Sequence, residues 1–137
     1  MAINKVICLD FDDVINDYDT WENEGYIKIK GEPIAGIKKA IAQFKKAGCT
    51  ILVHSVRCGH IGGANAISDY LAKHNIPVDA VCHNKPPADI YVDDKAITFK
   101  GKWNKSMIQS ILKFKGWNTS TSPYIYSEEC KDKLKEP

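Results

Sequence analysis

Short apolar runs alternate along this chain with stretches whose apolar residues recur at helical spacing. Four runs rich in β-branched residues predict buried strands, at 5–9, 50–53, 78–82 and 90–92. Three stretches with helical periodicity predict helices, at 34–48, 64–75 and 103–116. Because strands and helices alternate, we predict an α/β fold. It is a three-layer, Rossmann-like parallel sheet with right-handed crossovers and helices on both faces.

Weaker signals complete the prediction. The segment 97–99 is a candidate fifth strand, and the alternation at 26–30 suits an exposed hairpin arm. The length of 137 residues is that of one domain, which we place at residues 1–116. Residues 117–137 read as a Ser/Thr-rich link and a charged tail, in which Ser127 is placed to cap one short helix.

The charge distribution is uneven, although the net charge is only +2. Residues 1–25 hold seven acids against Lys5, whereas residues 95–127 hold six lysines and no acid. A net charge this small gives no strong field for nucleic acid over the whole protein. The acidic segment could bind a cation and the lysine-rich segment could bind an anion. Most lysine-rich segments, however, are simply solvated faces of the protein.

Cysteine content and hydropathy bear on the compartment. The five cysteines are an odd number, so they cannot all pair within one chain. The apolar stretch near the N-terminus, 6–9, is too short for a secretory signal, and no run approaches the roughly 20 apolar residues that span a bilayer. We therefore expect a reduced, cytoplasmic protein that does not enter membranes.

Polar side chains follow the predicted strands at the points where these end. They are Asp10, Asp12, Ser55, Lys85, Asp93 and Asp94. Each alone is typical of a turn or a helix cap, but ligands of parallel sheets bind outside the carboxyl ends of the strands. Carboxylates gathered there cost several kcal/mol, in rough terms, unless a cation lies among them. Oxygen ligands indicate a hard cation, with Mg²⁺ favoured over Ca²⁺, and a hydroxyl and an ammonium beside it suit phosphoryl transfer.

The order of these groups resembles the haloacid dehalogenase superfamily in its phosphatase branch. The run Asp10-Phe11-Asp12-Asp13-Val14 is similar to the first motif of that family, and 90–94 is similar to the fourth. Ser55 and Lys85 match the second and third motifs, which are single residues and weak alone. The resemblance covers about residues 4–100. A receiver domain of two-component signalling is disfavoured, because 49–55 offers no aspartate.

The resemblance implies a role for each matched residue. Asp10 is the expected nucleophile that forms an aspartyl-phosphate, and Asp12 is the expected acid and base for the leaving oxygen and the water. The implied Mg²⁺ ligands are Asp10, the backbone carbonyl of Asp12, Asp93 and, directly or through a neighbour, Asp94. The implied phosphate-binding residues are Ser55 and Lys85. From its place two residues after Ser55, Arg57 is a candidate for a second anionic group of the substrate, or a solvent-facing loop residue.

The chain departs from this family in two respects. Asp13 stands where the family often has glycine, which adds a negative charge and makes the turn less permissive. Only 18 residues separate Val14 from Pro33, and 29 separate Ser55 from Lys85, so we see no room for a cap domain. The site should be open, with a small flap near 21–30 in which Trp21 and Tyr26 line the site or cover the core.

Several functions remain open at this stage. A small phosphorylated metabolite or nucleotide is the favoured substrate, ahead of a nucleic-acid end or a phosphoprotein. The other possibilities are a phosphotransferase and a non-catalytic module that binds a phosphorylated ligand, although binding alone needs no nucleophile. A zinc site could also be proposed on four soft ligands, Cys58, His60, Cys82 and His83. We disfavour it, because these residues lack the paired Cys-x₂-Cys spacing of common zinc sites.

Overall fold

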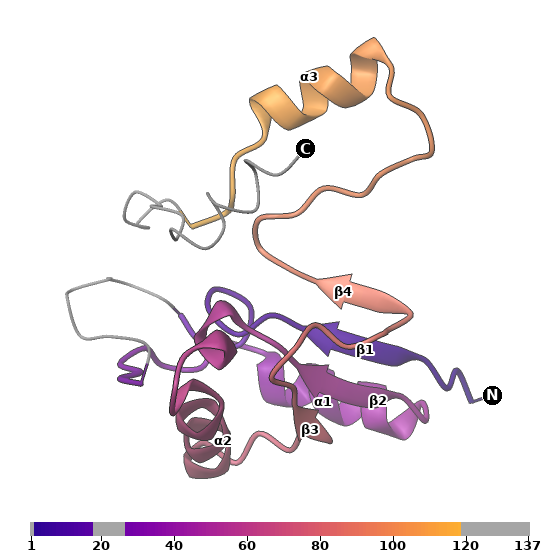
Figure 1. Ribbon diagram of the computed structural model, residues 1–137. Coiled ribbons are helices and arrows are strands. Elements are labelled where there is room, and N and C mark those ends of the chain that lie inside the picture. Colours follow the sequence, from indigo (N-terminus) through magenta and orange to yellow (C-terminus); the bar gives the residue numbers. More distant parts are fainter. Residues whose placement is uncertain (1, 18–26, 119–137) are drawn as a thin grey trace.

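The computed structural model describes residues 2–17 and 27–118. Four strands form one parallel sheet: β1 (Val6–Leu9), β2 (Thr50–Val53), β3 (Ala80–Val81) and β4 (Ile90–Val92). Their order is β3-β2-β1-β4, so β1 lies inside the sheet and β4 at one edge (Figure 1). The four predicted strands are confirmed, although the third is shorter than 78–82.

The described helices follow the predicted order. They are α1 (Ile37–Lys46), the short 3₁₀ helix η1 (Val56–Gly59), α2 (Gly63–Lys73) and α3 (Lys105–Lys113). The three predicted α-helices are confirmed with later starts or earlier ends. Gly48, with a φ of 85°, ends the first of them, because glycine adopts this left-handed conformation without strain.

The hydrophobic core lies on one face of the sheet. Alternate strand residues point into it (Ile7, Leu9, Ile51 and Val53), and both α1 and α2 pack on them. The prediction of helices on both faces is therefore wrong for the described residues. The order β1-α1-β2-α2-β3 moves in one direction through the sheet, and right-handed crossovers place both helices on the same side. The return from β3 to β4 is a short loop with two prolines and no helix.

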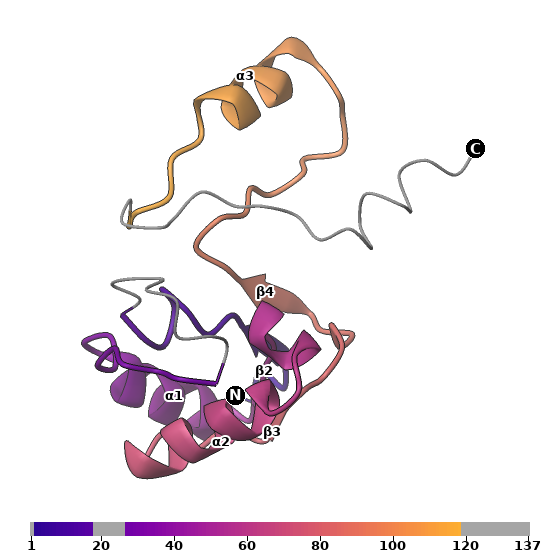
Figure 2. The ribbon, with the colours of Figure 1, turned by 60° about the vertical axis from the view of Figure 1, so that its left-hand side comes forward.

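The segment after β4 leaves the sheet. Residues 97–99 are not a strand, so the predicted fifth strand is absent, and 27–30 form no hairpin arm. Helix α3 contacts none of the other described helices or strands, and it stands away from the sheet in both views (Figures 1 and 2). The expectations for Trp21, Tyr26 and Ser127 lie outside the described residues.

Two further expectations concern topology and redox state. No helix among residues 2–17 and 27–118 is long and apolar enough to cross a membrane. The described cysteines are all free, and Cys8 and Cys58 are buried. The part of the chain that the structure describes contains no second folded unit over the sheet, in line with the absence of a cap.

Candidate functional site

Three carboxylates meet where β1 and β4 end. Leu9 and Val92 are paired as the last residues of these strands, and the Asp10 amide donates a hydrogen bond to the Val92 carbonyl at 2.9 Å. Asp93 and Asp94 follow directly. One carboxylate oxygen from each of these three aspartates lies within 4.8 Å of the others. The parallel pairing of two strands that are distant in sequence thus builds a group able to hold a cation.

The pKa values of two of these carboxyl groups, those of Asp10 and Asp94, are raised, as expected where carboxylates gather at a cation site. Burial raises the pKa of Asp10 from 3.8 to about 8, and the nearby charge of Asp93 and a hydrogen bond with Asp94 add to the rise. The Phe11 amide, which donates to Asp10 Oδ1 at 2.8 Å, opposes it. Burial also raises the pKa of Asp94, against the hydrogen bond with Asp10. A positive charge among them would favour the ionised form of all three carboxylates, and an all-oxygen donor set suits a hard cation such as Mg²⁺.

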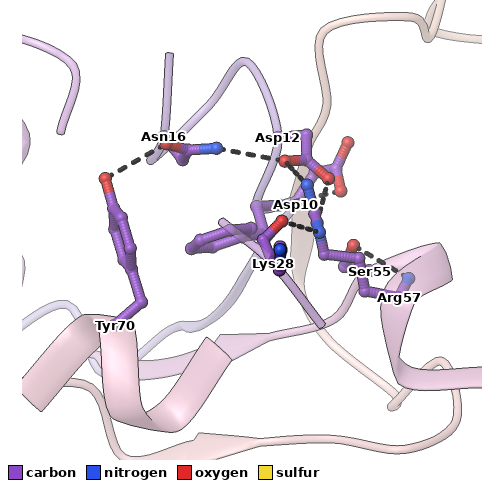
Figure 3. Close-up of polar contacts among 8 residues, drawn as sticks. Asp10, Asp12, Asn16, Lys28, Ser55, Arg57 and Tyr70 are labelled. Carbon is purple, nitrogen blue, oxygen red and sulfur yellow. Dashed lines mark hydrogen bonds and ion pairs between the residues drawn. The ribbon is translucent and has the colours of Figure 1, made fainter. Parts of the chain in front are cut away.

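Asp12 points to Arg57 rather than into the carboxylate group. Arg57 Nε donates to Asp12 Oδ2 at 2.8 Å, and Arg57 Nη2 donates to Oδ1 at 3.1 Å (Figure 3). Arg57 Nη1 also donates to the Lys28 carbonyl at 3.2 Å. The arginine therefore joins the end of β2, the loop after β1 and the segment around Lys28.

A second set of contacts holds Asp12 from the other side. Asn16 Nδ2 donates to Asp12 Oδ1 at 3.2 Å, and Asn16 is 1% exposed. The Tyr70 hydroxyl on α2 lies 3.1 Å from Asn16 Oδ1 and 2.9 Å from the Gly31 carbonyl, two acceptors for its single proton. These contacts run from α2 through the buried Asn16 to Asp12, so packing in the core fixes the position of this carboxylate.

Ser55 lies at the end of β2, where it starts η1. Its side chain is buried, and its Oγ accepts a hydrogen bond from the Arg57 amide at 3.2 Å. Helix α2 approaches η1 so closely that a Cβ on Gly63 would overlap the Arg57 carbonyl, so only glycine fits there. The close approach holds Ser55 and Arg57 at the same edge of the sheet as Asp12.

Asp13 takes the backbone conformation that glycine favours. Its φ is 63°, in the left-handed region that glycine adopts without strain and other residues adopt less readily. Its carbonyl accepts a hydrogen bond from Trp117 Nε1 at 2.9 Å, and its Oδ1 accepts one from Asn118 Nδ2 at 2.7 Å. The side chain that departs from the pattern therefore anchors the chain that returns from α3.

Lys85 is not brought to the carboxylates. Its Nζ lies 4.4 Å from the centre of the Tyr91 ring, on the opposite side of β4 from the core. Within residues 2–17 and 27–118, no hydrogen bond or ion pair joins Lys85 to Asp10 or Asp94. A cation on the ring face is a favourable contact of modest strength, and the long side chain has other rotamers available.

The structure thus brings together most of the residues that the sequence singles out. Asp10, Asp93 and Asp94 form one group, and Asp12, Ser55 and Arg57 form its neighbour. The soft ligands Cys58, His60, Cys82 and His83 form no metal-binding group of three or more in the described part of the chain. Sequence reasoning misses Asn16, Tyr70 and the link from Asp13 to Trp117. No spacing signal connects them, because they are 54 and 104 positions apart.

Comparison with family models, with curated proteins and with solved structures finds no match for this chain. The geometry of the described residues therefore carries the functional argument.

Proposed function

We propose that this chain is a Mg²⁺-dependent phosphomonoester hydrolase of the haloacid dehalogenase type that works through an aspartyl-phosphate on Asp10. The observation that supports it most is the approach of the Asp10, Asp93 and Asp94 carboxylates within 4.8 Å at the carboxyl edge of a parallel sheet. Such a group is costly without a cation, and active sites are where strongly shifted carboxyl pKa values gather.

Two displacements at phosphorus make up the proposed reaction. An oxygen of Asp10 first bonds to phosphorus while the ester P–O bond breaks, and the leaving oxygen takes a proton from Asp12. Water then attacks the same phosphorus, the P–O bond to Asp10 breaks, and the proton of that water passes to Asp12. A bound cation supplies the charge that lets Asp10 ionise and that offsets the charge of the phosphoryl group.

The neighbouring residues support this division of roles. Arg57 and Asn16 hold Asp12 through three donated hydrogen bonds, so the proton-transfer group has a fixed position. Ser55 lies at the end of β2 and offers its hydroxyl at the same sheet edge. A small phosphorylated metabolite or nucleotide is the substrate class we favour. Measuring phosphate release from a panel of substrates distinguishes small molecules from nucleic-acid ends and phosphoproteins.

The test is release of inorganic phosphate from a panel of phosphomonoesters, with Mg²⁺ and with a chelator, for wild type and for Asp10→Asn. We expect turnover only with Mg²⁺ and only in the wild type. The exposed Asp69 on α2 supplies a matched control, since Asp69→Asn makes the same change away from the site. Tight binding of phosphorylated ligands without any turnover would replace this proposal with a binding module. Phosphate transfer to added alcohols in preference to water would make the chain a phosphotransferase.

A further inference from the structure

We propose that this chain forms a two-fold symmetric dimer in which α3 of each copy packs against β4 of the other. Two apolar surfaces carry this inference. The strand surface consists of Ile90 and Val92 on β4. The helix surface consists of Ile108, Ile111 and Leu112 on α3.

The strand surface continues the core face of the sheet but lacks a helix over it. Ile90 is paired with Ile7 and Val92 with Leu9, so their side chains point to the face that α1 and α2 cover. Ile7 and Leu9 are buried beneath those helices, whereas Ile90 is 47% exposed and Val92 39% exposed. A parallel sheet in α/β proteins is covered by helices along its width. The edge at β4 therefore lacks one helix.

The helix surface is an apolar helix side of the kind that the strand surface lacks. Its three residues have the spacing of one helix side, and they are 47%, 41% and 73% exposed in sequence order. The chain from Lys95 to Lys115 leaves the sheet after Asp94, and its return is held by the bonds from Trp117 and Asn118 to Asp13. This excursion is held at both ends, and α3 stands away from its own sheet in both views (Figures 1 and 2).

Charge and area point to a second copy as the occupant. Residues 95–115 hold six lysines and no acid, while the exposed Asp89 precedes β4 at the end of the strand away from the proposed metal site. With the flanking Trp103 and Phe114, which are 71% and 41% exposed, each copy offers seven large apolar side chains for a partner to cover, and a standard stable interface takes roughly 800 Å² from each partner. Reciprocal exchange buries both surfaces in each copy, as a closed two-fold interface requires.

The first experiment measures the mass of the full chain by light scattering and sedimentation over a range of protein concentrations. We expect a dimer at twice the 15.3 kDa chain mass. Leu112→Asp should weaken the dimer by about 100-fold or more, because it places a charge at the centre of the apolar contact. Ser106→Asp puts the same charge on the opposite side of α3 and should leave the dimer intact. A monomer at every concentration, or a dimer unaffected by Leu112→Asp, would overturn the proposal.

A mixing experiment tests the reciprocal geometry. Ile90→Asp and Leu112→Asp should each be monomeric alone. Mixed in equal amounts they should pair, since one copy then offers an intact helix surface and the other an intact strand surface. Association of α3 with α3, or of β4 with β4, predicts no rescue on mixing, and that result would refute the exchange. Thermal melting verifies that each variant is folded, and Ile90→Thr replaces Ile90→Asp if the latter melts early.

Discussion

The guanidinium of Arg57 holds both carboxylate oxygens of Asp12, with Nε 2.8 Å from Oδ2 and Nη2 3.1 Å from Oδ1. The Arg57 side chain is 6% exposed and that of Asp12 is 20% exposed. A buried, two-pronged pair of this kind fixes direction as well as distance. Within the proposed reaction, Arg57 therefore acts on Asp12 as a positioning residue, rather than on a second anionic group of the substrate.

The first prediction concerns this pair. Arg57→Lys cannot reproduce the two-pronged contact, and Arg57→Gln removes the charge. We expect turnover of an alkyl phosphate to fall by about 10²-fold, the lower end of what a positioned acid contributes. An aryl phosphate, whose leaving oxygen needs no proton, should lose much less. The ratio of the two rates is the measurement, and equal losses on both substrates would contradict the positioning role.

Folding needs a control in that experiment, because removing one partner of a buried ion pair costs roughly 3–5 kcal/mol of stability. Ile67 on α2 is fully buried in the hydrophobic core. Ile67→Ala should cost a similar amount, about 2–5 kcal/mol. This variant should change the rates on the alkyl phosphate and the aryl phosphate by the same factor.

A second prediction concerns the nucleophile. Asp10→Asn keeps the shape of the side chain and removes its charge, so the covalent step has no attacking oxygen. We expect a loss of turnover of about 10³-fold or more, with an unchanged circular dichroism spectrum. If the purified variant kept more than about a tenth of the wild-type rate, the aspartyl-phosphate route would be wrong.

The convergence of strand ends explains why part of the site is predictable. Carboxyl ends of parallel strands meet at one edge of the sheet, so Asp10 after the first strand and Asp93 after the fourth are expected to lie close together. The structure brings them together within 4.8 Å. The motif spacing also predicts that Ser55 lies just after the second strand, and in the structure it caps η1 two residues after β2 ends.

The direction of long side chains is less predictable than the position of strand ends. Arg57 and Lys85 each have several rotatable bonds, and packing decides that one lies on Asp12 and the other on the Tyr91 ring. The helix count was predictable from periodicity, but the covered face was not. It depends on the sheet order, and hydrophobic spacing does not encode that order.

The third prediction concerns the metal. Asp93→Asn removes one of three charged ligands, so we expect the affinity for Mg²⁺ to fall by about tenfold or more while the metal-free fold is kept. In the metal-free protein the change relieves the repulsion that raises the pKa of Asp10, so it should not destabilise. Calorimetric titration of Mg²⁺ into both proteins is the measurement, with Asp69→Asn as the control. Equal affinities would remove Asp93 from the metal site.

The fourth prediction concerns the lysines around α3. The triple change of Lys102, Lys105 and Lys113 to Gln should leave turnover of a small phosphomonoester unchanged, because no ion pair in the described part of the chain joins these lysines to the aspartates of the site. We also expect negligible binding of a phosphorylated oligonucleotide by wild type at physiological salt. A wild-type affinity that falls with salt by about one log unit of slope per phosphate contacted, and a slope lost in the variant, would instead favour a nucleic-acid end as substrate.

The last prediction concerns stability and pH in the metal-free protein. Burial raises the pKa of folded Asp10 from 3.8 to about 8, so below about pH 4 the residue is protonated in both the folded and the unfolded chain. Between these two values only the folded chain keeps the proton. Unfolding then releases it, and the free energy of unfolding falls as the pH rises through this window.

Urea unfolding in the presence of a chelator, from about pH 4 to about pH 8, measures this decline. Asp10→Asn does not titrate and should show a flatter profile, with greater stability than wild type at the upper end of the range. Saturating Mg²⁺ at that upper pH should raise the stability of wild type more than that of Asp10→Asn, because the ion binds most tightly to the ionised group. Parallel profiles for the two proteins would show that Asp10 is not the group whose burial shapes the pH dependence. They would also remove the main physical argument that a cation binds at this edge of the sheet.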